Sequence, residues 1–416
     1  MAEINRGYLD TIRGISTPDR PGGGARLRRA LGRSLVALRV AGRVALLPVL
    51  LLYAALLVLA LGAVARLRGR RSAPAGSLQE RAAAHVGEFA AQYPLHLYPV
   101  LIKALELAFI TGNLEGRVRP GSDAVVELAV GDGTLSARVF PATTGVVALD
   151  LNPYSLVQTR SCPHISRRVV ADCLEPPVAD GGADFLISNN LLHHVTDKGR
   201  TLANWSRLAP LALFNENTGH WASGWFRPYA LRALGLSARA ARAARAIEEH
   251  SLQALLPAAA LDALVGASYA IEERESAFDE RVFFLSAVCS TLLGCYGPPT
   301  PAPLKRILNG PLRLLAAPLT RAAARALLRH DAWCDRTRDV LVAWVVRSRT
   351  VPGGGPRGAV RLVCPDCRGG LAGSSCTKCG RVFEELDGML FLLPERLRRQ
   401  VTYVPDQRDA LGREHL

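Results

Sequence analysis

Short apolar runs alternate with amphipathic segments through the middle of this chain, and this pattern predicts a parallel β-sheet. The segment from Leu78 to Ile110, which comes first, is predicted to form helices. Continuous apolar runs of about four to eight residues are typical of strands that helices cover on both faces. The fold class is therefore α/β and doubly wound. The expected strands are AVVELAV (124–130), GVVALDL (145–151), SRRVVAD (166–172), ADFLISNN (183–190) and LALFNEN (211–217), with DVLVAWVVRSR (339–349) as the last strand.

An uncharged apolar run of 22 residues, from Val44 to Ala65, precedes this region. As a helix it would extend about 1.5 Å per residue and reach roughly 33 Å, which matches the hydrocarbon core of a bilayer. Arginines flank the run on both sides. A single span would export one basic flank, whereas an interfacial helix would keep both flanks on anionic headgroups. We expect a membrane helix of one of these two kinds, and a buried helix of a soluble domain is the alternative.

The formal net charge of +15 is concentrated near the N-terminus. Residues 1–81 contain fourteen arginines and four acidic residues, a difference of +10. Because the rest of the chain is close to balanced, the charge marks a membrane-facing segment, and nucleic acid is an unlikely partner. We expect a membrane-associated protein with its catalytic domain in the cytoplasm. The sequence leaves the oligomeric state open.

Residues suited to ligand binding stand where the predicted strands end. The first strand leads into a turn with Gly131 and Gly133, and the next two end at Asp150 and Asp172. In a doubly wound sheet ligands bind at the carboxyl ends of the strands, where glycine allows close backbone approach and a carboxylate can accept both ribose hydroxyls. A dinucleotide site of the GxGxxG type is a weak match, because Ser136 takes the place of the third glycine.

This series of motifs resembles class I S-adenosylmethionine-dependent methyltransferases. ELAVGDG (127–133) matches the first motif, with Ala129 in place of its first glycine. Asp150 in VVALDLNP matches the acid that closes the second strand, and Asp172 in VVADCLEP matches the acid near the adenine. ADFLISNNLLHHV (183–195) resembles the small-molecule branch of the ubiquinone and menaquinone type.

The resemblance covers roughly residues 80–349 and implies S-adenosylmethionine as the cofactor. It predicts methyl transfer to a small-molecule, lipid or lipid-linked acceptor at the membrane. The alternatives are an RNA or protein methyltransferase that uses a C-terminal ribbon as an adaptor, and a non-catalytic scaffold of the same fold. The residues that the resemblance implies for the cofactor are Glu127, Ala129, Gly131, Gly133, Asp150, Leu151, Asp172, Cys173 and Asn189.

Three titratable residues near the same strand ends are candidate catalytic groups. His193 and His194 are expected to start the helix after the fourth strand, and Glu216 lies in FNENTG at the end of the fifth. An imidazole can remove a proton from a hydroxyl nucleophile near neutral pH. The alternative is that one histidine packs and the other bonds the backbone, and that Glu216 is a capping or ion-paired carboxylate.

Four of the nine cysteines form two CxxC pairs, and this spacing predicts a structural metal site. Two such pairs supply four thiolates for tetrahedral zinc and leave no open coordination position. The segment is too small to fold on an apolar core alone, which is why it would need the metal. CPDC…CTKCGRVFEELDGMLFLLPE also resembles the zinc-ribbon appendix related to the tRNA-methyltransferase activator subunit. The predicted zinc ligands are Cys364, Cys367, Cys376 and Cys379.

These segments predict a chain of six parts in which one catalytic domain carries two appendages. Composition and motif positions set the boundaries, and a Gly- and Pro-rich stretch separates the catalytic domain from the ribbon. The parts are a basic N-terminal segment (1–43), a hydrophobic membrane helix with its basic flank (44–71), a methyltransferase domain (72–350), a linker (351–360), a zinc ribbon (361–396) and a tail (397–416).

Overall fold

The computed structural model describes residues 76–93, 97–121, 123–131, 133, 135–218, 256–279, 311–328, 339–353, 358–401 and 403. The predicted membrane helix of residues 44–65 and its flanks lie outside the described residues. The tail beyond Tyr403 lies outside them as well. Within the described part of the chain, no helix is both long enough and apolar enough to cross a membrane.

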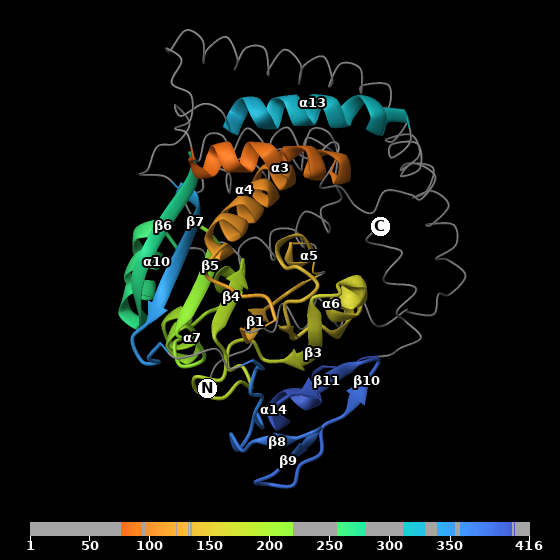
Figure 1. Ribbon diagram of the computed structural model, residues 1–416, viewed down its shortest axis with the longest axis vertical. Helices are drawn as coiled ribbons and strands as arrows, with labels where there is room; N and C mark the ends of the chain where they lie inside the picture. The colour runs from red at the N-terminus through yellow and green to blue at the C-terminus, as the bar shows by residue number, and fades with distance from the viewer. Residues whose placement is uncertain are drawn as a thin grey trace, which may run out of the picture.

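A mixed sheet forms the centre of the described structure, in the order β10-β11-β3-β2-β1-β4-β5-β7-β6 (Figure 1). The five strands predicted first run parallel, and β1 lies between β2 and β4. The strand order therefore reverses beside β1, and ligands bind at such a switch point. The strands of the catalytic part are β1 (Val125–Leu128), β2 (Val146–Asp150), β3 (Ile165–Ala171), β4 (Phe185–Asn189), β5 (Leu211–Asn217), β6 (Tyr269–Asp279) and β7 (Asp339–Ser348).

Strand β7 matches the predicted last strand, and it enters the sheet antiparallel between β5 and β6. The sequence analysis did not predict β6, because its residues 272–275 are charged. An edge strand tolerates such a run because one side faces water and charge discourages pairing with another chain. Arg347 Nε lies 2.6 Å from Glu272 Oε1, and Arg81 Nη2 lies 2.8 Å from Glu275 Oε2.

Helices cover both faces of the sheet, which confirms the predicted α/β class. Helices α3 (Leu78–Gln92), α4 (Leu97–Leu114) and α13 (Pro311–Leu328) form one layer, and α7 (Lys198–Trp205) and α10 (Ala258–Ser268) lie on the other face (Figure 1). Successive strand residues face opposite layers. Val125 thus packs in the core beneath α3 and α4, while Val126 packs in the core that includes α7 and α10.

Local capping residues set where the helices at the carboxyl edge begin. Asn152 Oδ1 accepts a hydrogen bond from the Tyr154 N–H at 3.0 Å, and Pro153 takes the first position of α6 (Pro153–Gln158). Asp197 Oδ1 accepts from the Arg200 N–H at 3.0 Å and caps α7. Side-chain caps and an N-terminal proline are strong helix-start signals, so these helices begin directly after the strand-end turns.

The C-terminal module is built into the central sheet. Strand β11 (Met389–Leu392) runs parallel to β3, and β10 (Glu385–Leu386) pairs antiparallel with β11. Strands β8 (Leu371–Ala372) and β9 (Ser375–Cys376) pair separately, and α14 (Glu395–Arg398) follows β11. Cys364, Cys376 and Phe383 share one hydrophobic core with β3. The predicted linker therefore separates two parts of the sequence that fold around the same core.

Candidate active site

The loop after β1 passes through left-handed backbone at Ala129, Gly131 and Gly133. A Cβ at Gly133 would lie 3.1 Å from Thr159 Cγ2 and 3.2 Å from Cys162 Sγ, so the packing there requires glycine. A Cβ at Gly131 would meet no atom within 4 Å, so this glycine borders open space. Ala129 has a φ of 53°, a conformation that costs an L-residue about 1 kcal/mol. The alanine thus retains the backbone shape that the glycine motif needs.

Asp150, the last residue of β2, faces this loop. Its Oδ2 accepts a hydrogen bond from the Gly131 N–H at 3.0 Å, and its Oδ1 accepts from the Asn152 N–H at 2.8 Å. Burial raises the pKa of Asp150 to about 6, although these N–H groups favour the charged form. A carboxylate has about four lone-pair positions, so Asp150 can accept further hydrogen bonds from a bound diol.

Glu127 lies in β1 and is 7% exposed. Burial raises its pKa to about 7, a hydrogen bond with Ser136 opposes that shift, and the charge of Asp150 adds to it. Among the described residues, its Oε2 has no hydrogen-bond partner. A buried oxygen without a partner is uncommon. This oxygen, the open space at Gly131 and the Asp150 carboxylate fit a ligand that carries N–H donors and a ribose.

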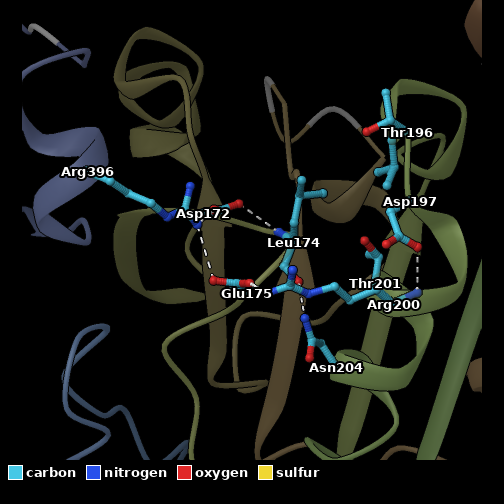
Figure 2. Close-up of a pocket in the computed structure, with 10 residues that line it drawn as sticks. Asp172, Leu174, Glu175, Thr196, Asp197, Arg200, Thr201, Asn204 and Arg396 are labelled. Carbon is cyan, nitrogen blue, oxygen red and sulfur yellow. Dashed lines mark hydrogen bonds and ion pairs between the residues drawn. The ribbon is translucent and has the colours of Figure 1, made fainter. Parts of the chain in front are cut away.

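Asp172 follows β3, and a distant residue holds its side chain. Its Oδ1 accepts from the Leu174 N–H at 3.0 Å, and its Oδ2 lies 2.7 Å from Arg396 Nη2. Figure 2 shows Arg396 reaching from α14 toward Asp172 and Glu175. The sequence analysis did not select Arg396, because nothing in its local sequence connects it to residues more than 200 positions earlier.

Cys173 follows Asp172, and its side chain is buried. Its Sγ lies 3.6 Å from the Leu149 carbonyl oxygen, and it packs in the hydrophobic core. Burial raises the pKa of this thiol well above its ordinary value. The Trp205 Nε1–H donates to the Cys173 carbonyl at 2.8 Å and fixes this turn. The cofactor contact of Cys173 stays a prediction.

Glu216 is buried and holds the loop after β4. Its Oε1 accepts from the N–H groups of Leu191 and Leu192 at 2.7 and 2.6 Å, and its Oε2 lies 3.1 Å from His193 Nδ1. This geometry favours a positioning role for Glu216. The two histidines lie in a 3-10 turn (Leu192–His194), where the sequence predicted the start of a helix, and the next helix begins at Lys198. Their ring centroids are 4.0 Å apart.

A buried network of amides follows the ends of β4 and β5, and it includes a residue that the sequence analysis missed. Glu106 of α4 is fully buried, and its carboxylate accepts from Lys103 Nζ at 2.9 Å, from Asn189 Nδ2 at 3.3 Å and from Asn190 Nδ2. Asn215 Nδ2 donates to Asn189 Oδ1 at 2.9 Å. The only available signal was a charged pair in the apolar run of α4. The side chain of Asn189, which was predicted to contact the cofactor, thus forms hydrogen bonds within this network.

The four predicted metal ligands lie together in the C-terminal module. Their Sγ atoms lie within 4.8 Å of one another, with Cys364 and Cys379 3.9 Å apart and Cys367 and Cys376 3.4 Å apart. The Cys379 N–H and Lys378 N–H lie 3.5 and 3.4 Å from Cys376 Sγ, and they lower the pKa of that thiol to about 6. Four thiols in this arrangement fit tetrahedral Zn²⁺ with no open position.

Comparison with known proteins finds a family match over the segment from β1 to the residue before β5. Residues 126–210 match the family described as a methyltransferase domain. No curated protein matches the chain. Among similar solved structures, a cyclopropane synthase from Mycobacterium tuberculosis is 14% identical over 65% of this chain and 98% of that chain, with a TM-score of 0.39. A phosphoethanolamine N-methyltransferase from Haemonchus contortus is 14% identical over 57% of this chain and 51% of that chain, with a TM-score of 0.35.

The matched span contains Glu127, Asp150 and Asp172. Residues 126–210, which carry most of the strand-end motifs, therefore match a methyltransferase domain. This agrees with the class that the strand-end motifs predicted. The branch of the class and the kinship of the C-terminal module stay predictions.

Proposed function

We propose that this enzyme transfers a methyl group from S-adenosylmethionine to a small-molecule, lipid or lipid-linked acceptor at a membrane surface. The observation that carries the cofactor assignment is the Asp150 carboxylate, which backbone N–H groups hold at the switch point of the sheet. The uncharged run from Val44 to Ala65 supports the membrane location. The similarity of residues 183–195 to the quinone-type branch supports an apolar acceptor.

Several residues of this chain suit the parts of the cofactor. Asp150 would accept the ribose hydroxyls, Gly131 would leave room for the ligand, and the unpartnered Glu127 Oε2 would accept from the methionine ammonium. S-adenosylmethionine, when bound, supplies an electrophilic methyl group on a sulfonium. The protein's own contribution is then to bind, to orient the acceptor and to exclude water.

His193 is the residue best placed to take a proton from a hydroxyl acceptor. Its Nδ1 faces the buried Glu216 carboxylate at 3.1 Å, which favours the tautomer with the proton on Nδ1. Its Nε2 is then an acceptor. The His193 side chain is 16% exposed, so the ring keeps some access to bound molecules. A carboxylate–imidazole pair of this kind fixes both the ring orientation and the proton position.

Substitution of the two neighbouring histidines tests this role. His193→Ala should lower kcat about 100-fold for a hydroxyl acceptor, since general-base catalysis contributes at that scale. Raising the pH should recover part of the loss, because the acceptor then ionises by itself. His194→Ala is the matched control, because His194 is exposed and adjacent, and it should change kcat little. Equal losses in the two variants would contradict a general-base role for His193.

The acceptor class is tested by methyl transfer from labelled S-adenosylmethionine to a lipid extract, a metabolite extract, RNA and protein in parallel. Label in an organic-soluble product, absent with Asp150→Ala, is the expected result. Label mainly in RNA or protein would replace the proposed acceptor class. Absence of transfer to every pool, together with no cofactor binding by calorimetry, would leave a non-catalytic scaffold.

Fractionation tests the membrane location. The full chain should sediment with membranes and stay there at high salt, because an apolar run of this length buries far more surface than screened headgroup contacts stabilise. A chain that lacks residues 1–72 keeps every described element and should be soluble and bind the cofactor. Release by salt would reduce the segment to a basic peripheral anchor. An insoluble truncated chain would make residues 44–65 a core helix of the domain.

A further inference from the structure

We infer that the C-terminal module completes the cofactor site by supplying Arg396, which positions Asp172 to accept from the adenine amino group. The inference rests on the proposed function, because it takes S-adenosylmethionine as the ligand. Asp172 is 4% exposed and directly follows β3, the strand next to β2. Arg396, which fixes the Asp172 carboxylate, lies C-terminal to the four cysteines in the sequence.

The pairing of β11 with β3 places Arg396 close to Asp172. Strand β11 runs parallel to β3, and its last residue, Leu392, pairs with Ala171, the residue before Asp172. Parallel strands end at the same edge of a sheet, so the segment after β11 emerges beside the strand ends that carry the site. Helix α14 begins at Glu395, and Arg396 thus stands at the carboxyl edge.

A chain of ion pairs then orients the Asp172 carboxylate. Arg396 Nη2 lies 2.7 Å from Asp172 Oδ2 and 3.2 Å from Glu175 Oε2. Glu175 in turn pairs with Arg200 of α7. Figure 2 shows these side chains converging on a small pocket between the turn after β3 and α7. The Leu174 N–H holds the other oxygen, Asp172 Oδ1, at 3.0 Å.

The four-cysteine cluster anchors the helix that carries Arg396. Asp366 lies between Cys364 and Cys367, and its Oδ1 accepts from the Glu395 N–H at 3.1 Å, at the start of α14. Its other oxygen pairs with Arg381, whose Nη2 also donates to the Leu393 carbonyl at 3.1 Å. The first CxxC turn therefore fixes the position of α14.

Apolar contacts secure the same helix from the other side. Leu397 of α14 is fully buried in a cluster with Val130, in the loop after β1, and Leu156, in α6. Leu151, the residue after Asp150, packs against that cluster as well. The ring centroids of Tyr403 and Tyr154 are 5.3 Å apart. The module thus contacts the ribose side of the site through packing and the adenine side through Arg396.

This arrangement leaves Asp172 able to bind a ligand. Two of its lone-pair positions are occupied, and a carboxylate offers about four. Arg396 holds the carboxylate in one orientation, and the remaining lone pairs then suit an amino group that donates. Without Arg396 the side chain loses its charge-assisted partner and its fixed orientation. Arg396 is therefore a positioning residue for the adenine end.

Calorimetry of the full chain in detergent with S-adenosylhomocysteine tests the inference. Arg396→Ala should weaken binding about tenfold, as expected for the loss of one charge-assisted contact. The matched control is Arg398→Ala, which removes an exposed arginine from the same helix and should change Kd less than about twofold. Arg396→Lys keeps the charge without the planar fork and should give an intermediate Kd.

A second ligand separates positioning from a general loss of structure. S-inosylhomocysteine carries an oxygen where adenine carries its amino group, so the wild type should prefer S-adenosylhomocysteine. Arg396→Ala should reduce this preference, whereas loss of structure would weaken both ligands equally. Asp366→Ala should weaken binding alone but add little to Arg396→Ala, because both act through α14.

The outcomes distinguish the two levels of the proposal. If the wild type binds neither ligand, the cofactor assignment of the proposed function fails. If the wild type binds S-adenosylhomocysteine, and Arg396→Ala leaves both its Kd and its preference unchanged, the role of Arg396 is overturned. Tighter binding by Arg396→Ala would also overturn it, because Arg396 would then compete with the adenine.

Discussion

Two carboxylates stand side by side at the carboxyl edge of the sheet, and different parts of the chain hold them. Asp150 accepts from backbone N–H groups of Gly131 and Asn152, which lie 19 and 2 positions away in the sequence. Asp172 pairs with Arg396, which lies 224 positions away. The proposed ribose end of the site is therefore built within the first strands, while the proposed adenine end also uses a residue from the C-terminal module.

This difference separates two kinds of site construction. Backbone N–H groups are present whatever the side chains are, so the hold on Asp150 forms as soon as β1 and β2 pair. The Leu174 N–H holds Asp172 locally, but the contact with Arg396 forms only when β11 has joined β3 and α14 has been anchored beside the first CxxC turn. Substitutions in the C-terminal module should therefore weaken the contacts with the adenine and leave the contacts with the ribose unchanged.

Loss of the cysteine cluster should have the largest effect. Cys376→Ser should lower the zinc content from about one ion per chain to none, because a structural site needs all four thiolates. The melting temperature should fall, since Cys376 is 3% exposed in the core shared with β3. The helical signal should persist, and binding of S-adenosylhomocysteine should weaken and lose its preference for adenine.

The neighbouring Thr377→Ala is the control for that substitution. Its hydroxyl is exposed and donates to the Gly370 carbonyl at 3.0 Å, but it supplies no thiolate. It should keep the metal, as measured by elemental analysis. Wild-type protein purified without chelators that contains no metal would contradict the assignment of a zinc site.

Removal of the locally held carboxylate should have the next largest effect. Asp150→Ala should weaken cofactor binding by about 2 kcal/mol, or roughly 30-fold, because two charge-assisted hydrogen bonds to the ribose are lost. The adenine preference should remain, since Asp172 and Arg396 are untouched. Asp180→Asn, a change at an exposed carboxylate, is the control for calorimetry. An unchanged Kd in Asp150→Ala would remove Asp150 from the site.

The smallest effect concerns pH, and it again separates the two ends. Burial raises the pKa of Asp150 to about 6, so its charged form is lost below that pH. Affinity for S-adenosylhomocysteine should fall roughly tenfold between pH 7 and pH 5, because a protonated carboxyl accepts fewer hydrogen bonds. Asp150→Asn should bind more weakly and show a flatter profile. A profile unchanged by that substitution would assign the titration to another group.

The stability of the free protein should change in the opposite direction. A carboxyl whose pKa is raised on folding contributes stability that is present at low pH and lost as the pH rises through the folded value. For Asp150 that loss runs from its ordinary pKa of 3.8 up to about pH 6, and for Glu127 it runs from 4.5 up to about pH 7. Thermal melts from pH 5 to pH 8 without ligand check this sign.

Local patterns determined much of this architecture. Apolar runs predicted the five parallel strands to within about two residues, because strands buried on both faces must be apolar throughout. The strand-end positions of Gly131, Asp150 and Asp172 predicted that these residues share one edge of the sheet, because parallel strands end at one edge. Cysteine spacing predicted the cluster of four thiols. These features depend on residues close in sequence, where periodicity and spacing carry the information.

Other features depended on contacts that no local pattern encodes. The charged sequence of the edge strand β6 is typical of a surface segment. In the structure the strand pairs with β7, and arginines from other elements form ion pairs with it. Glu216 resembles a free carboxylate at a strand end, yet the N–H groups of a neighbouring loop occupy it. Nothing in the local sequence distinguishes Arg396 from the other arginines of the chain. Packing between distant segments decides which side chains contact each other. The ion pair between Asp172 and Arg396 is such a contact, and it connects the C-terminal module with the candidate active site.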